Sequence, residues 1–92
     1  MNSLSRGLSL VATANRHRRL TNALNELDAV ADATMVCDGP NTAEESPSFR
    51  TEIVVAREFK AVPPTVLETV ADHGVRLTPQ PPQGDRVVVW AR

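Results

Sequence analysis

The chain has 92 residues, of which 41% are hydrophobic, 23% charged and 3% aromatic, and its formal net charge is −1. This length allows a single domain over residues 1–92, and the composition excludes collagen-like, repetitive and fully disordered chains. A stacking platform for single-stranded nucleic acid is nearly excluded as well, because the chain has no tyrosine, two phenylalanines and one tryptophan.

Residues 9–33 are predicted to form the first helix. Hydrophobic side chains recur there at spacings of four, three and four residues, which places them on one stripe: Leu20, Leu24, Leu27 and Ala31. Ser9 is a candidate N-cap, and Gly7 argues against helix further upstream. Residues 1–8 are therefore predicted to be a flexible N-terminus.

A short strand and a long strand are predicted on either side of an acidic loop. Residues 34–37 are β-prone, and residues 38–48 begin with an Asp-Gly-Pro-Asn turn sequence. Glu44 and Glu45 make this segment acidic, and we expect a mobile, solvated loop. Residues 49–59 alternate as in a half-buried antiparallel strand, with one mostly apolar face: Phe49, Thr51, Ile53, Val55, Arg57 and Phe59.

A second helix is predicted to begin at the Pro63-Pro64 pair, because the first helical turn tolerates proline. Its apolar stripe is short: Val66, Leu67, Val70 and Ala71. Gly74 is placed to adopt the left-handed conformation that ends a helix. Two further strands are predicted over residues 75–78 and 86–91, separated by a loop with three prolines.

The predicted order of elements is α-β-β-α-β-β. Elements of these lengths suit an α+β, two-layer sandwich, in which two helices cover one face of a four-stranded antiparallel sheet. A ferredoxin-like β-α-β-β-α-β sandwich would have the same order if its first strand moved to the end. This permuted ferredoxin-like arrangement is a topological analogy, and a fold analogy does not identify a function.

A basic cluster lies in the first predicted helix, where Arg16, His17, Arg18 and Arg19 follow one another. Arg16 and Arg19 share a flank of the helix, whereas Arg18 points well away. One hypothesis is that Arg16, Arg18 and Arg19 contact nucleic-acid phosphates. The alternative is a solvated helix flank with some arginines paired to acids, and the net charge of −1 favours this alternative.

Arg57 is a charged residue on the apolar face of the predicted long strand. An unpaired buried guanidinium is very costly, so we expect Arg57 to lie near the end of the sheet or to pair with Glu68 or Asp72. The functional alternative is an anion or carboxylate clamp.

The sequence contains no recognisable set of catalytic or metal-binding residues. Cys37 is the only cysteine, so no internal disulfide can form, and a reducing cytoplasm is the expected location. Cys37 with His17 and His73 does not supply the four ligands of a zinc site or a recognisable nucleophile signature. We therefore expect no metal, no cofactor and no enzymatic activity, and we interpret Cys37 as a buried small thiol.

The expected function is that of a small interaction or regulatory domain that acts through protein contacts and forms a homodimer. The side of the sheet away from the helices is predicted to expose apolar residues among charged ones: Val36, Val54, Val88 and Trp90. Val54, Val88 and Trp90 are the candidate interface residues, because tryptophan is a favoured interface anchor. The alternative is a nucleic-acid-binding or transcription-associated accessory protein that uses the basic helix. No apolar run is long enough to cross a membrane, so no membrane contact is expected.

Overall fold

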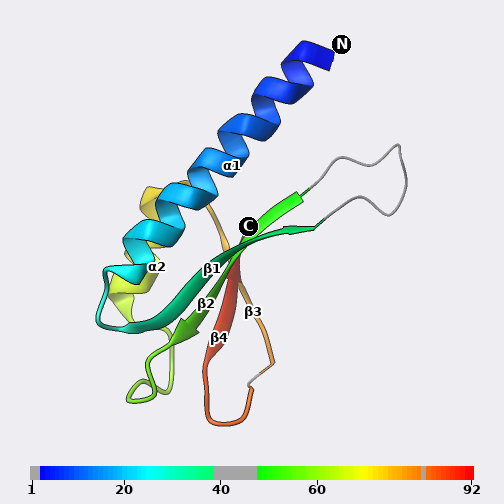
Figure 1. The fold of residues 1–92 in the computed structure, drawn as a ribbon. Helices are drawn as coiled ribbons and strands as arrows, with labels where there is room; N and C mark the ends of the chain where they lie inside the picture. The colour runs from blue at the N-terminus through cyan, green and yellow to red at the C-terminus, as the bar shows by residue number, and fades with distance from the viewer. Residues whose placement is uncertain (1–2, 39–47, 82) are drawn as a thin grey trace.

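A computed structural model describes residues 3–38, 48–81 and 83–92 of the chain (Figure 1). The elements, in chain order, are α1 (Ser3–Asn25), β1 (Val30–Asp38), β2 (Ser48–Val55), α2 (Pro64–Asp72), β3 (Leu77–Pro79) and β4 (Val88–Ala91). The predicted α+β class and the predicted α-β-β-α-β-β order are confirmed. The acidic segment over residues 39–47, with Glu44 and Glu45, lies outside the described residues.

The four strands form one antiparallel sheet in the order β1-β2-β4-β3. Both helices pack against the same side of this sheet (Figure 1). The long strands β1 and β2 pair over their whole length, whereas β3 and β4 are short. The analogy with a permuted ferredoxin-like sandwich stays a prediction.

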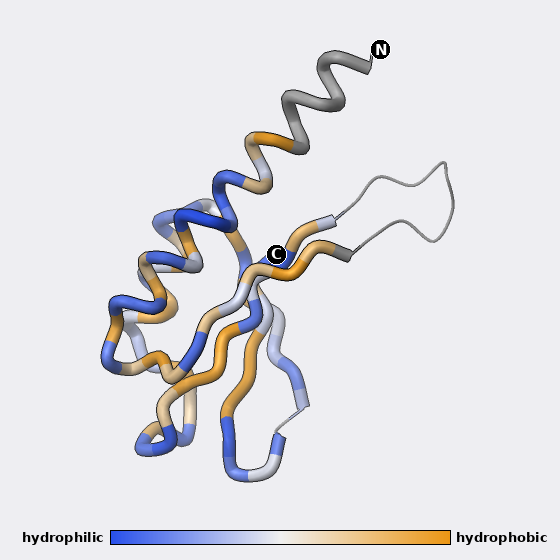
Figure 2. Tube along the Cα trace, in the orientation of Figure 1, coloured by the Kyte–Doolittle hydropathy of each residue, from blue (hydrophilic) through white to orange (hydrophobic). Residues whose placement is uncertain are grey.

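The hydrophobic core lies between the helices and the sheet. Ile53 in β2 is opposite Ala33 in β1 and Val89 in β4, so these three side chains point to the same side of the sheet. The alternation predicted for β2 is thereby confirmed between Thr51 and Val55, which are both fully buried. Figure 2 shows the apolar stretches of the strands next to one another in the middle of the sheet. The buried core cluster contains ten residues: Leu20, Leu24, Val30, Ala33, Ile53, Val66, Val70, Val75, Val89 and Ala91.

The first helix ends at Asn25, eight residues earlier than predicted, so Ala31 belongs to β1. The side-chain amide of Asn25 donates to the carbonyl of Ala33 and accepts from its backbone N–H, both at 3.0 Å. This contact satisfies backbone groups on the outer edge of β1, where no neighbouring strand does so. The acids that follow, Glu26 and Asp28, would also oppose the helix dipole if the helix continued.

The first helix begins at Ser3 rather than at Ser9, so Gly7 lies inside it. A single glycine costs a helix only about 1 kcal/mol, which does not end it. The predicted flexibility of residues 1–8 stays a prediction. The first half of α1 extends past the sheet (Figure 1), and the radius of gyration of 14.4 Å accordingly exceeds the ~12 Å expected for a compact chain of this length.

The second strand ends at Val55, four residues before its predicted end. The backbone N–H of Ala56 donates to Ala29 at 2.8 Å, and Phe59 N–H donates back to the Ala56 carbonyl in a turn. Arg57 lies in this turn and is exposed. The prediction that Arg57 stands on the apolar face of a strand is therefore wrong, and among the described residues it forms no ion pair with Glu68 or Asp72.

Both ends of α2 follow the sequence prediction. Pro63 is the N-cap and Pro64 the first helical residue. At the other end, Gly74 has a φ of 70°, its N–H donates to Ala71, and the N–H of Val75 donates to Val70. This is the hydrogen-bond pattern of a Schellman motif, and Val75 is buried as the motif requires. The strand β3 begins at Leu77, two residues after its predicted start at residue 75. The strand β4 begins at Val88, two residues after its predicted start at residue 86.

Candidate functional site

The side of the sheet that the helices leave uncovered is the first candidate site, and we call it the open face. Strand register assigns these residues to it, among others: Asp32, Thr34 and Val36 from β1, Arg50, Glu52 and Val54 from β2, Val88 and Trp90 from β4, and Thr78 from β3. Arg92 continues this face beyond β4, where its backbone forms two hydrogen bonds of 3.0 and 2.9 Å with Arg76. The predicted positions of Val36, Val54, Val88 and Trp90 on one side of the sheet agree with this register.

Trp90 lies at the centre of the open face and is flanked by two arginines. The guanidinium carbon of Arg50 lies 4.3 Å from the centroid of the Trp90 ring, and that of Arg92 lies 5.2 Å away. Both distances are typical of cation–π contacts. Arg50 also donates to a carboxylate oxygen of Glu52 at 3.1 Å, which places an ion pair beside the ring. These contacts place two guanidinium groups and one carboxylate around the indole ring.

The three candidate interface residues differ in exposure. Val54 and Trp90 are half-buried, so part of each side chain faces solvent. Val88 is only 6% exposed, so it packs against its neighbours on the sheet and offers little surface area to a partner. Arg50 and Arg92 were not among the residues singled out from the sequence. The position of Arg50 beside Trp90 depends on strand pairing between residues that are about 40 positions apart, whereas Arg92 is two residues from Trp90 and lies on the same face through the alternation of the strand.

The basic cluster of α1 is divided by the structure. Arg16 and Arg19 line a cleft of about 480 Å³ between α1 and the end of α2. Arg18 does not line this cleft, and it donates to the side-chain carbonyl of Asn15 at 3.0 Å. Of the three arginines proposed for nucleic-acid contact, two line this cleft and the third binds Asn15, which also lines it.

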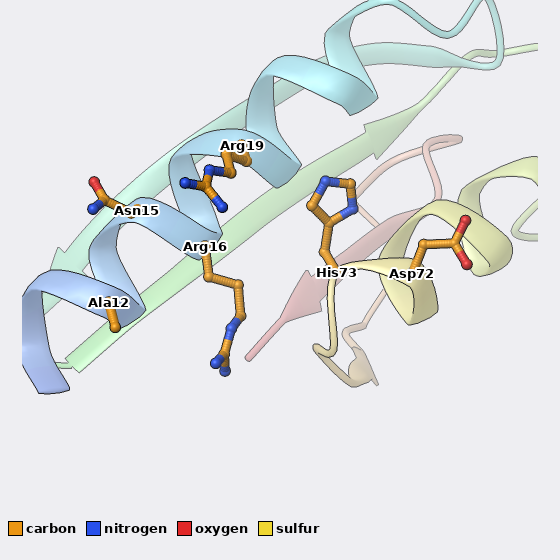
Figure 3. A pocket seen from close by; sticks show the side chains of 6 residues that line it. All are labelled: Ala12, Asn15, Arg16, Arg19, Asp72 and His73. Atoms are coloured by element: carbon orange, nitrogen blue, oxygen red, sulfur yellow. The ribbon is translucent and has the colours of Figure 1, made fainter.

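His73 faces the two arginines from the opposite wall of this cleft (Figure 3). Its Nδ1 lies 2.8 Å from the backbone carbonyl of Thr69, which can only accept a hydrogen bond, so Nδ1 carries a proton. The ring reaches toward α1, whereas the carboxylate of Asp72 points away from Arg16 and Arg19 (Figure 3). Among the described residues neither arginine forms an ion pair.

A buried polar cluster joins α1 to the sheet behind the basic residues. His17 is 2% exposed and its Nδ1 lies 3.1 Å from the hydroxyl of Thr51, which is fully buried. The hydroxyl of Thr21 lies 3.3 Å from that of Thr51. Burial, together with the neighbouring charge of Arg16, lowers the pKa of His17 from its ordinary value of 6.5. The position of His17 near the apolar stripe of the helix indicated in the sequence that this residue faces the core. Its hydrogen-bond partner on β2 could not be predicted from the sequence.

Cys37 is exposed, so the prediction of a buried thiol is wrong. It is opposite Phe49 on the part of the β1–β2 pair that extends beyond β4, where the sheet has only two strands. Within residues 3–38, 48–81 and 83–92, no three His, Cys, Asp or Glu side chains are grouped in a way that could hold a metal ion.

No helix in the described parts of the chain has both the length and the apolar character needed to span a membrane. Comparisons with protein-family models, with curated proteins and with solved structures find no match to this chain. The function must therefore be argued from the residues of the two candidate surfaces themselves.

Proposed function

We propose that this protein is a small non-enzymatic interaction domain that forms a homodimer through its open face. The observation that carries the proposal is the position of Trp90 at the centre of a sheet face that neither helix covers. Tryptophan and arginine are the residue types most enriched at the energetic centres of protein interfaces. Here two arginines stack on the only tryptophan of the chain, so the contact surface is already ordered before a partner arrives.

The distribution of charge on the open face supports a second copy of the chain as the partner. Glu52 lies directly opposite Trp90, whereas Asp32 lies toward the end of the face where β1 begins, and Arg50, Arg92 and Arg76 lie toward the other end. A two-fold axis through Trp90 would place the acidic end of one copy over the basic end of the other. A closed dimer of this kind uses the same patch on both copies, as isologous interfaces do.

A cytoplasmic location completes the proposal. A chain with one exposed thiol and no disulfide is suited to a reducing compartment. An exposed Cys37 outside the open face also provides a site for a spectroscopic label that does not disturb the proposed interface.

The experiment is sedimentation velocity on the full chain between about 1 and 100 μM, combined with the emission spectrum of Trp90. We expect a monomer–dimer equilibrium, and we expect the Trp90 emission to shift to longer wavelength on dilution, because the indole becomes more exposed. Val54→Glu places an additional acid on the open face and should leave only monomer. Leu67→Glu is the matched control, because Leu67 is a 47% exposed apolar residue of α2 on the other side of the molecule.

A dimer that persists in Val54→Glu but is lost in Leu67→Glu would overturn the proposal and place the contact on the helices. A wild-type chain that remains monomeric across this range would overturn self-association altogether. Circular dichroism of each variant establishes that the comparison is made between folded proteins. Loss of the dimer at high salt in the wild type would support the charge pairing, because exposed charges are then screened.

A further inference from the structure

We infer that the cleft between α1 and α2 binds the phosphate group of a small phosphorylated molecule. Its two walls bring together Arg16 and Arg19 from the first helix and His73 from the end of the second. These residues are far apart in sequence, and none of them belongs to the open face. The inference is therefore independent of the proposed dimer.

The two arginines supply the positive charge of the site. Residues 16 and 19 are three positions apart, so their side chains leave α1 from one flank. Neither arginine forms an ion pair within the described parts of the chain, so their charges are available to a ligand. The one acid that lines the cleft is Asp72, and its carboxylate points away from them (Figure 3). Guanidinium groups bind phosphate oxygens through short, charge-assisted hydrogen bonds.

His73 contributes a fixed hydrogen-bonding group from the opposite wall. Its Nδ1 donates to the Thr69 carbonyl at 2.8 Å, which sets the orientation of the ring and leaves Nε2 on the side of α1 (Figure 3). In the imidazolium form Nε2 donates to a phosphate oxygen, and in the neutral form it accepts from a phosphate hydroxyl.

The shape of the cleft favours a small ligand over a nucleic acid. Its volume of about 480 Å³ is within the range of sites for small molecules. A nucleic-acid backbone requires basic residues spread along a track, but Arg18 is turned away from Arg16 and Arg19 and is held by Asn15. The chain as a whole also carries a net charge of −1. Three side chains that can bind phosphate oxygens line the cleft, two from α1 and one from the end of α2.

The experiment is an NMR titration of the full chain with three probes: inorganic phosphate, ribose 5-phosphate and a 12-nucleotide single strand at low salt. The imidazole signals of His73 should shift with ribose 5-phosphate, whereas those of the buried His17 should not. The variant Arg16→Gln/Arg19→Gln should weaken the binding of ribose 5-phosphate about tenfold or more, because it removes two charge-assisted contacts. Arg57→Gln/Lys60→Gln is the matched control, because it removes the same charge from two exposed residues that do not line the cleft, and binding should stay within about twofold.

Binding of inorganic phosphate alone with the same dependence on Arg16 and Arg19 would support a phosphate site that takes the free ion. Absence of any shift at His73 with both small probes would overturn the inference, and this readout uses the wild-type protein, so it does not depend on how the variants fold. Binding of the single strand that is weakened equally by both double variants would also overturn it, because the affinity would then follow total charge and not the cleft.

Discussion

The buried contact between His17 and Thr51 permits a sharp test of how α1 is held on the sheet. Thr51 is fully buried, its hydroxyl lies 3.1 Å from His17 Nδ1, and His17 is itself 2% exposed. Thr51→Val keeps the size and shape of the side chain but removes the partner of the imidazole. An unsatisfied buried polar group costs about 1–3 kcal/mol. The additional buried methyl group returns about 0.8 kcal/mol, so we expect a net loss of about 0.2–2 kcal/mol in the free energy of unfolding.

Such a loss is large for a chain of this size, whose total stability is on the order of 5–14 kcal/mol. At its upper end this loss corresponds to a fall in the melting temperature of roughly 8–16 °C. The variant His17→Leu/Thr51→Val replaces both partners by apolar groups, so it should be more stable than the sum of the single changes predicts by about 1 kcal/mol. Urea unfolding of the wild type and three variants at pH 7.5, followed by circular dichroism, measures this coupling. Additivity of the single changes within about 0.5 kcal/mol would refute the reasoning.

Two further predictions follow from the same structure. Because the pKa of His17 is lowered in the folded chain, the unfolded chain binds a proton at this residue more readily. The free energy of unfolding should therefore fall as the pH drops from about 6.5 toward the folded pKa. The contribution of His17 to this fall should disappear in His17→Leu but remain in His73→Gln. Gly74 has a φ of 70°, and an added Cβ meets no atom within 4 Å. Gly74→Ala should therefore lower the free energy of unfolding by about 1 kcal/mol through backbone strain alone. Gly74→Asn should lower it less in the same unfolding assay. Equal stability of the alanine and asparagine variants at position 74 would contradict this account.

Features that depend on neighbouring residues could be predicted from the sequence. The Pro63-Pro64 start of α2 and its end at Gly74 follow from the backbone preferences of proline and glycine, and both are confirmed. The alternation along β2 correctly assigned Thr51, Ile53 and Val55 to the buried side. Local patterning of this kind was sufficient for the order of the elements and for the fold class.

The boundaries that depend on distant contacts were predicted wrongly. The helix α1 ends at Asn25 because the amide of that residue binds the backbone of Ala33 across the turn, and no periodicity indicates this. The strand β2 ends at Val55 because the following residues form a turn, closed by the hydrogen bond from the Phe59 N–H to the Ala56 carbonyl, which leaves Arg57 exposed. A tertiary hydrogen bond ends the first pattern and a turn ends the second, although each pattern would otherwise continue.

The sequence by itself determined that the chain folds as one α+β domain and that a basic segment and a single tryptophan stand out from the rest. Only the tertiary structure decided what these features contact. Strand pairing placed Arg50 against Trp90, and helix packing placed Arg16 and Arg19 on the wall of a cleft that His73 lines from the other helix. The physical reason is that each candidate surface is made by residues from different elements, and their approach depends on the packing of the whole core.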